Sequence, residues 1–95
     1  MRFEDIIILM RLVGTKIGGA DMNKVYIRGK GVSEKRARRV MSQVYGNNNF
    51  KTCLKRGEVH MYFPDNIYKA QINQFARVLN LSVSFFKTKA ILDRD

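Results

Sequence analysis

Aromatic and basic residues alternate with apolar ones along three short segments of the sequence. These residues are Tyr26 and Arg28, then Lys51 and Lys55, then His60 and Tyr62. Every second side chain of a β-strand points to the same face, so in strands they would line one surface. Nucleic-acid bases stack on aromatic rings for about 1–3 kcal/mol each, while Lys and Arg pair with phosphates. The pattern therefore favours binding of a polyanion.

A second group of basic residues lies on a predicted helix that begins after Ser33, a good N-cap, and stops at Gly46. Its apolar stripe has the helical i, i+3, i+4, i+7 spacing: Ala37, Val40, Met41 and Val44. Outside this stripe, or just before the helix, lie Lys30, Lys35, Arg36, Arg38 and Arg39. A solvated helix face usually mixes charge signs, but only Glu34 opposes these cations. The helix is therefore predicted to contact phosphates, or to enter a nucleic-acid groove.

The net charge of +10 is concentrated in the middle of the 95-residue chain. Residues 24–63 hold ten basic residues against two acids, and one of the ten, Arg56, lies in the turn predicted at residues 55–57. Such a concentration of positive charge attracts phosphate backbones and accelerates encounter with them. We therefore expect RNA or another polyanion as the partner.

Several function classes fit poorly. One cysteine, Cys53, and one histidine, His60, cannot build a disulfide framework or an intrachain Cys/His zinc site, and neither metal nor cofactor is expected. The scattered carboxylates form no spacing typical of acid–base catalysis, so the prediction is that the protein is not an enzyme. The apolar run within residues 3–13 is too short for a membrane span, and a cytoplasmic location is expected, in a host cytoplasm if the protein is viral.

The chain contains a faint internal repeat, with Val25 and Val59 as equivalent starting points. Each copy predicts strand, helix, strand: strands near residues 25–28, 50–54, 59–63 and 81–86, and a second helix opening at Pro64 and Asp65 and stopping at Asn80. This order predicts an α+β, ferredoxin-like βαββαβ fold, an antiparallel four-stranded sheet with two helices on one face. A single domain is expected, with residues 1–23 as an N-terminal extension, 24–89 as the core and 90–95 as a tail.

The alternation in the predicted strands assigns side chains to the two sheet faces. Residues expected to face the helices include Val25, Ile27, Phe50, Leu54, Val59, Met61, Phe63, Leu81, Val83 and Phe85. The opposite face would hold the aromatic and basic strand residues named above, together with Cys53, Ser82, Ser84 and Phe86. In the N-terminal extension, residues 3–13 fit either a helix or a buried strand.

Residues 25–29, Val-Tyr-Ile-Arg-Gly, resemble the short first-strand motif of the RNA recognition motif family. Residues 56–63, Arg-Gly-Glu-Val-His-Met-Tyr-Phe, are similar to that family's third-strand octamer, although Glu58 stands where an aromatic is usual and Val59 where a small residue is usual. The resemblance implies RNA binding on the sheet, with Tyr26 and His60 stacking on bases and Arg56 contacting phosphate.

Two other functions are compatible with the sequence. In style, without any shared motif, the chain resembles small early proteins of T-even-type bacteriophages, which suggests an inhibitor or antitoxin-like adaptor that binds a host protein or ribonucleoprotein. A DNA-binding protein that places the basic helix in a major groove is the third alternative. The sequence leaves the oligomeric state and any base preference open.

Overall fold

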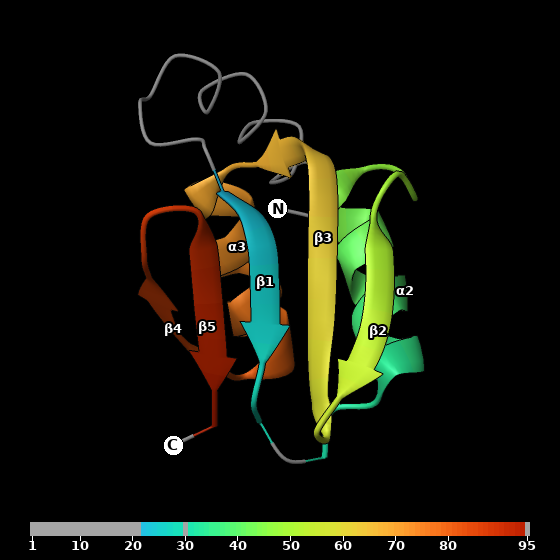
Figure 1. The fold of residues 1–95 in the computed structure, drawn as a ribbon, viewed down its shortest axis with the longest axis vertical. Helices are drawn as coiled ribbons and strands as arrows, with labels where there is room; N and C mark the ends of the chain where they lie inside the picture. Colours follow the sequence, from blue (N-terminus) through green and yellow to red (C-terminus); the bar gives the residue numbers. More distant parts are fainter. Residues whose placement is uncertain (1–21, 30, 95) are drawn as a thin grey trace.

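The structure is a computed structural model that describes residues 22–29 and 31–94. In this part of the chain, two helices pack on one face of a five-stranded sheet of order β2-β3-β1-β5-β4 (Figure 1). The elements follow one another as β1 (Met22–Ile27), α2 (Glu34–Tyr45), β2 (Lys51–Lys55), β3 (Glu58–Ile67), α3 (Lys69–Leu79), β4 (Ser82–Phe85) and β5 (Lys89–Asp93). The α+β class predicted from the sequence is confirmed.

The central strand β1 determines how the rest of the sheet is built. It pairs antiparallel with β3 on one side and parallel with β5 on the other, which makes the sheet mixed. β2 extends the sheet beyond β3, and β4 extends it beyond β5. α2 packs against β2 and β3, whereas α3 packs against β4, so the two helices cover different halves of the same face.

The prediction of a four-stranded antiparallel sheet is wrong because residues 89–93 form strand β5 instead of belonging to the end of the core and a tail. β5 lies between β1 and β4, and its Ala90 and Leu92 are fully buried. A tight turn joins the two last strands, with the Phe86 N–H donating to the Lys89 carbonyl at 2.8 Å. The burial of residues 89–93 alternates as in a strand, but their sequence, Lys-Ala-Ile-Leu-Asp, is a short apolar run without alternation of polar and apolar residues.

Helix α2 forms as the sequence predicts. The Ser33 hydroxyl accepts a hydrogen bond from the Arg36 N–H at 3.1 Å, which satisfies one of the free amides of the first turn. All four residues of the predicted apolar stripe are buried, and Gly46 ends the helix with a left-handed φ of 95°. This burial fixes the rotation of the helix and therefore which of its cations are exposed.

Helix α3 begins later than the sequence predicts. Pro64 and Asp65 belong to the long strand β3, and the helix starts at Lys69, where the Tyr68 N–H donates to Gln71 Oε1 at 3.1 Å. β3 continues because Ile67 pairs with Met22 after an irregularity in the β1–β3 register, and both side chains are buried. A proline is compatible with such an irregular strand as well as with a helix start. The predicted stop at Asn80 is confirmed by its left-handed φ of 58°.

The hydrophobic core lies between the sheet and the two helices. The predicted inward residues of β1 and β3 are all buried, and Phe50 and Phe63 stack with ring centroids 5.2 Å apart. The predicted inward residues of the other end of the sheet, Leu81, Val83 and Phe85, are partly buried. Leu54 is wrongly predicted, because it lies on edge strand β2 and is 59% exposed.

The predicted helix or strand at residues 3–13 lies outside the described residues, as do most of the N-terminal extension and Lys30. In residues 22–29 and 31–94, neither helix has the length and apolar character needed to cross a membrane.

The position of β5 inside the sheet predicts a specific stability effect. Leu92→Ala should lower the free energy of unfolding by about 2–5 kcal/mol, because it leaves a cavity in the core. Ile91→Ala, on the same strand but on the half-buried opposite face, should cost clearly less. Urea denaturation followed by circular dichroism measures both. Equal and near-zero effects would mean that residues 89–93 do not form an inner strand.

Candidate nucleic-acid interface

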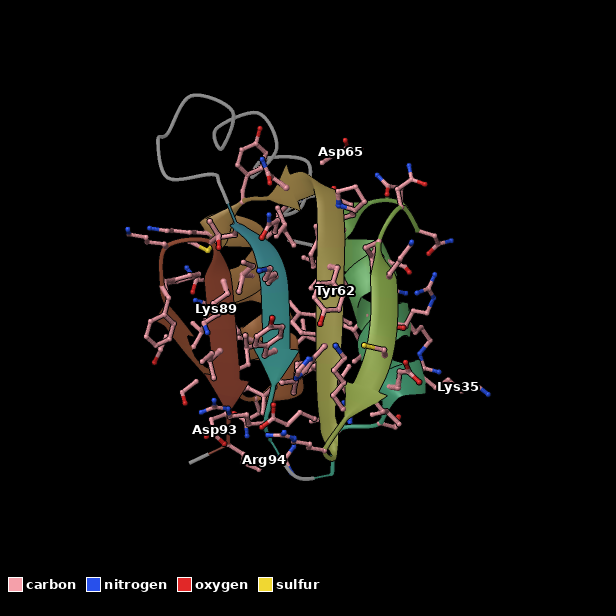
Figure 2. All side chains as sticks on the ribbon, viewed as in Figure 1. Lys35, Tyr62, Asp65, Lys89, Asp93 and Arg94 are labelled. Atoms are coloured by element: carbon pink, nitrogen blue, oxygen red, sulfur yellow. The ribbon has the colours of Figure 1, made fainter. Side chains whose placement is uncertain are left out.

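The face of the sheet opposite the helices, called here the open face, is covered by no described helix or strand. The strand registers place on it side chains from all five strands. These residues, with Arg28 directly after β1, are Lys24, Tyr26, Arg28, Lys51, Cys53, Lys55, Glu58, His60, Tyr62, Ser82, Ser84, Lys89, Ile91 and Asp93. Figure 2 looks onto this face and shows Tyr62 in front of β3 and Lys89 in front of β5. The face holds five Lys and Arg side chains against two acids.

Three rings form an aromatic cluster at the centre of the open face. Tyr26 and His60 are partners in the β1–β3 register, and their rings stack with centroids 4.1 Å apart and planes inclined by 24°. Tyr62 lies edge-on to both rings, with centroids 6.2 Å from Tyr26 and 6.4 Å from His60. Cross-strand ring pairs of this kind add stability beyond the area they bury. The rings are therefore held in place without a ligand.

Glu58 organises the polar side of the cluster. Its Oε1 lies 3.0 Å from His60 Nε2, and its Oε2 lies 3.4 Å from Arg28 Nε. The Tyr62 hydroxyl lies 3.4 Å from His60 Nδ1, so both ring nitrogens of His60 have a polar neighbour. The acid at this position thus has a cation and a ring nitrogen as partners, which reduces its repulsion of a phosphate.

Lysines surround the aromatic cluster. Lys55 Nζ lies 5.9 Å from the Tyr62 ring centroid, and Lys89 Nζ lies 5.7 Å from the Tyr26 ring centroid. Partial burial raises the pKa of the Tyr62 phenol above its ordinary value, although Lys55 lowers it in part. The Tyr62 hydroxyl is therefore protonated at neutral pH. A hollow of about 220 Å³ adjoins Tyr62 and is lined by Asn23, Lys24, Tyr62, Phe63 and Pro64. This arrangement offers stacking surfaces next to positive charge.

The predicted site residues fall on two sides of the sheet. The structure brings together Tyr26, Arg28, Lys51, Lys55, His60 and Tyr62 on the open face, and it places Arg56 in the turn between β2 and β3. Lys35, Arg36, Arg38 and Arg39 belong to α2 on the helix side. Lys35 extends outward beyond the β2 edge in Figure 2. The two predicted surfaces are thus separate, with edge strand β2 between them.

Arg38 differs from its basic neighbours on α2. Its Nη1 lies 3.4 Å from both the Phe50 carbonyl oxygen and Thr52 Oγ1, and its guanidinium lies 5.0 Å from the Phe50 ring centroid. The side chain therefore packs between α2 and the start of β2, whereas Lys35, Arg36 and Arg39 are exposed. Helical spacing alone cannot separate a cation that packs from one that points to solvent.

Sequence reasoning missed Lys24, Lys89 and Ile91 as open-face site residues. The short apolar run of residues 90–92 was a weak strand signal for the last two, because a strand there places Lys89 and Ile91 on one face. Lys24 directly precedes the predicted strand and shares the face of Tyr26.

Cys53 is a free thiol and is paired in register with His60. In the described part of the chain, no cluster of three or more His, Cys, Asp or Glu side chains is arranged to hold a metal ion.

Comparison with known proteins adds no family to this description. No protein-family model matches the chain, and neither a curated protein nor a solved structure is significantly similar to it.

The contacts of Arg38 predict that it contributes to stability. Arg38→Ala should lower the free energy of unfolding by about 1–2 kcal/mol, because it removes both hydrogen-bonding and packing contacts. Arg39→Ala removes the same charge from the exposed face and should stay within about 0.5 kcal/mol of the parent protein. Thermal or urea unfolding of the two variants provides the comparison. Indistinguishable stabilities would contradict the packing role of Arg38.

Proposed function

We propose that the protein binds single-stranded nucleic acid, with RNA as the favoured ligand, on the open face of the sheet. The observation that carries the proposal is the aromatic cluster of Tyr26, His60 and Tyr62 at the centre of a face that also bears five cations. Rings with nearby Lys and Arg are the combination that single-strand-binding surfaces use. A duplex hides its bases in the stack, so this combination suits unpaired bases.

The preference for RNA rests on the resemblance described above. The residues that carry it, 25–29 and 56–63, fall on β1, on β3 and on the residues directly after β1 and before β3, and these two strands are neighbours in the sheet. The resemblance implies two rings on adjacent strands, and Tyr26 and His60 are such a pair. Their stacking on each other differs from two rings that each receive a base, so the free edges and outer sides of the cluster are what a ligand would meet.

Exposed cations of α2 would have a secondary role. Lys35, Arg36 and Arg39 lie on the opposite side of the sheet from the aromatic cluster. Lys51 and Lys55 lie on the open face itself, and Lys55 contacts Tyr62. A strand bound to the rings would therefore reach the lysines of β2 first, and it would contact α2 only by passing around the β2 edge.

The two surfaces can be compared with variants that remove equal charge. Lys51→Ala/Lys55→Ala should weaken binding of a labelled single-stranded RNA more than Lys35→Ala/Arg39→Ala, because the first pair flanks the rings. For the first pair, the slope of log K against log salt should fall by roughly 1.4, from about 0.7 for each phosphate contact on a single strand. Fluorescence anisotropy over a salt series gives both quantities.

Competition with other ligands completes this experiment. Single-stranded RNA should displace the labelled strand better than duplex DNA at matched salt. Binding that does not depend on salt would contradict the proposal. A larger loss for the α2 pair together with a preference for duplex DNA would favour groove binding by the helix. A captured protein partner that survives nuclease treatment, with no oligonucleotide binding, would favour the adaptor.

A further inference from the structure

Lys89 and Phe86 belong to the hairpin between β4 and β5 and lie beside the aromatic cluster. The Lys89 ammonium is 5.7 Å from the Tyr26 ring centroid and 5.9 Å from the Phe86 ring centroid. Phe86 is 51% exposed, which is unusual for a phenylalanine, and its N–H bonds to the Lys89 carbonyl. One flexible cation thus lies near two rings, one on β1 and one in the turn after β4.

Among the described residues, His60 is the one ring that stacks on Tyr26. Because β1 lies between β3 and β5, His60 and Lys89 reach Tyr26 from strands on opposite sides of β1, with Ile91 as the register partner of Tyr26 on β5. Towards β5, an ammonium near this half-buried ring is held more weakly than a stacked base would be. Its long flexible stem lets the ammonium move without moving the backbone.

Lys89 also has a cation as its neighbour. It is the register partner of Lys24 on the parallel strand β1, so two lysine side chains start from neighbouring positions on the open face. Like charges at such positions repel each other. An anion that binds to both ammonium groups would remove this repulsion, and a backbone phosphate has the required charge.

We infer that Tyr26, Phe86, Lys24 and Lys89 form a binding site for one nucleotide unit of a single strand. A base takes the place of the Lys89 ammonium beside Tyr26 and Phe86, and the two lysines hold the adjoining phosphate. The inference rests on the proposed function and assigns a stacking role to Phe86.

The test uses the full chain, a short single-stranded RNA, and the same strand with its bases removed at internal positions. Phe86→Leu should weaken binding of the intact RNA by roughly five- to fiftyfold, because one stack is lost. Binding of the abasic strand should not change. Lys89→Met should weaken binding of both strands and lower the salt slope by roughly 0.7, because one phosphate contact is lost.

Two variants serve as matched controls. Lys69→Met removes an ammonium that also lies over a ring, at 5.4 Å from the Phe85 centroid, but on the helix side of the sheet. Leu54→Ala removes an exposed apolar side chain from edge strand β2. Both should bind the intact RNA like the parent protein, apart from a small general charge effect for Lys69→Met.

The outcomes separate this site from the proposed function. If the parent protein binds RNA and Phe86→Leu binds it equally well, the nucleotide site is wrong and the proposed function stands. If Phe86→Leu weakens the intact and abasic strands equally, Phe86 does not contact a base, and the site is again wrong. If the parent protein binds neither strand, the proposed function itself fails. Unfolding midpoints of all variants verify that they are folded.

Discussion

The pairing register between β1 and β3 is the constraint on which the remaining features depend. It places Val25 opposite Met61 and Ile27 opposite Val59, and all four side chains are buried between the sheet and the helices. A shift by one residue would turn these side chains outward and bury the polar ones. The same register sets Tyr26 opposite His60, so the core that stabilises the fold also builds the aromatic cluster.

The neighbours of these two strands complete the open face. β2 adds Lys51 and Lys55 on one side, and β5 adds Lys89 on the other. Three of the five cations therefore come from the strands that flank β1 and β3, while Lys24 and Arg28 come from β1 and the residue after it. The three rings come from β1 and β3. On the far side of the sheet, α2 holds its apolar stripe against the core and uses Arg38 for packing, which leaves fewer free cations there than its sequence indicates.

The sequence predicts those parts of the fold where local patterns and packing agree. Helix α2 has a cap, a periodic stripe and a glycine stop, and β1 and β3 alternate regularly, so their faces were predicted correctly. β5 and the start of α3 were not predicted, because both depend on distant partners. Lys89–Asp93 becomes a strand by pairing with β1, and Pro64 remains in β3 because Ile67 pairs with Met22. The same holds for the candidate site. The rings of Tyr26, His60 and Tyr62 could be predicted from the alternation in β1 and β3, whereas the position of Lys89 on β5 could not.

The central claim is that a single-stranded ligand lies on the open face, and NMR mapping of the bound complex tests it most directly. Aromatic and amide resonances are followed while a short single-stranded RNA is added at low salt. The account predicts that the largest changes occur at the rings of Tyr26, His60 and Tyr62 and at the amides of β1 and β3, with small changes on α3. Changes confined to the exposed residues of α2, with unchanged ring resonances, would contradict it.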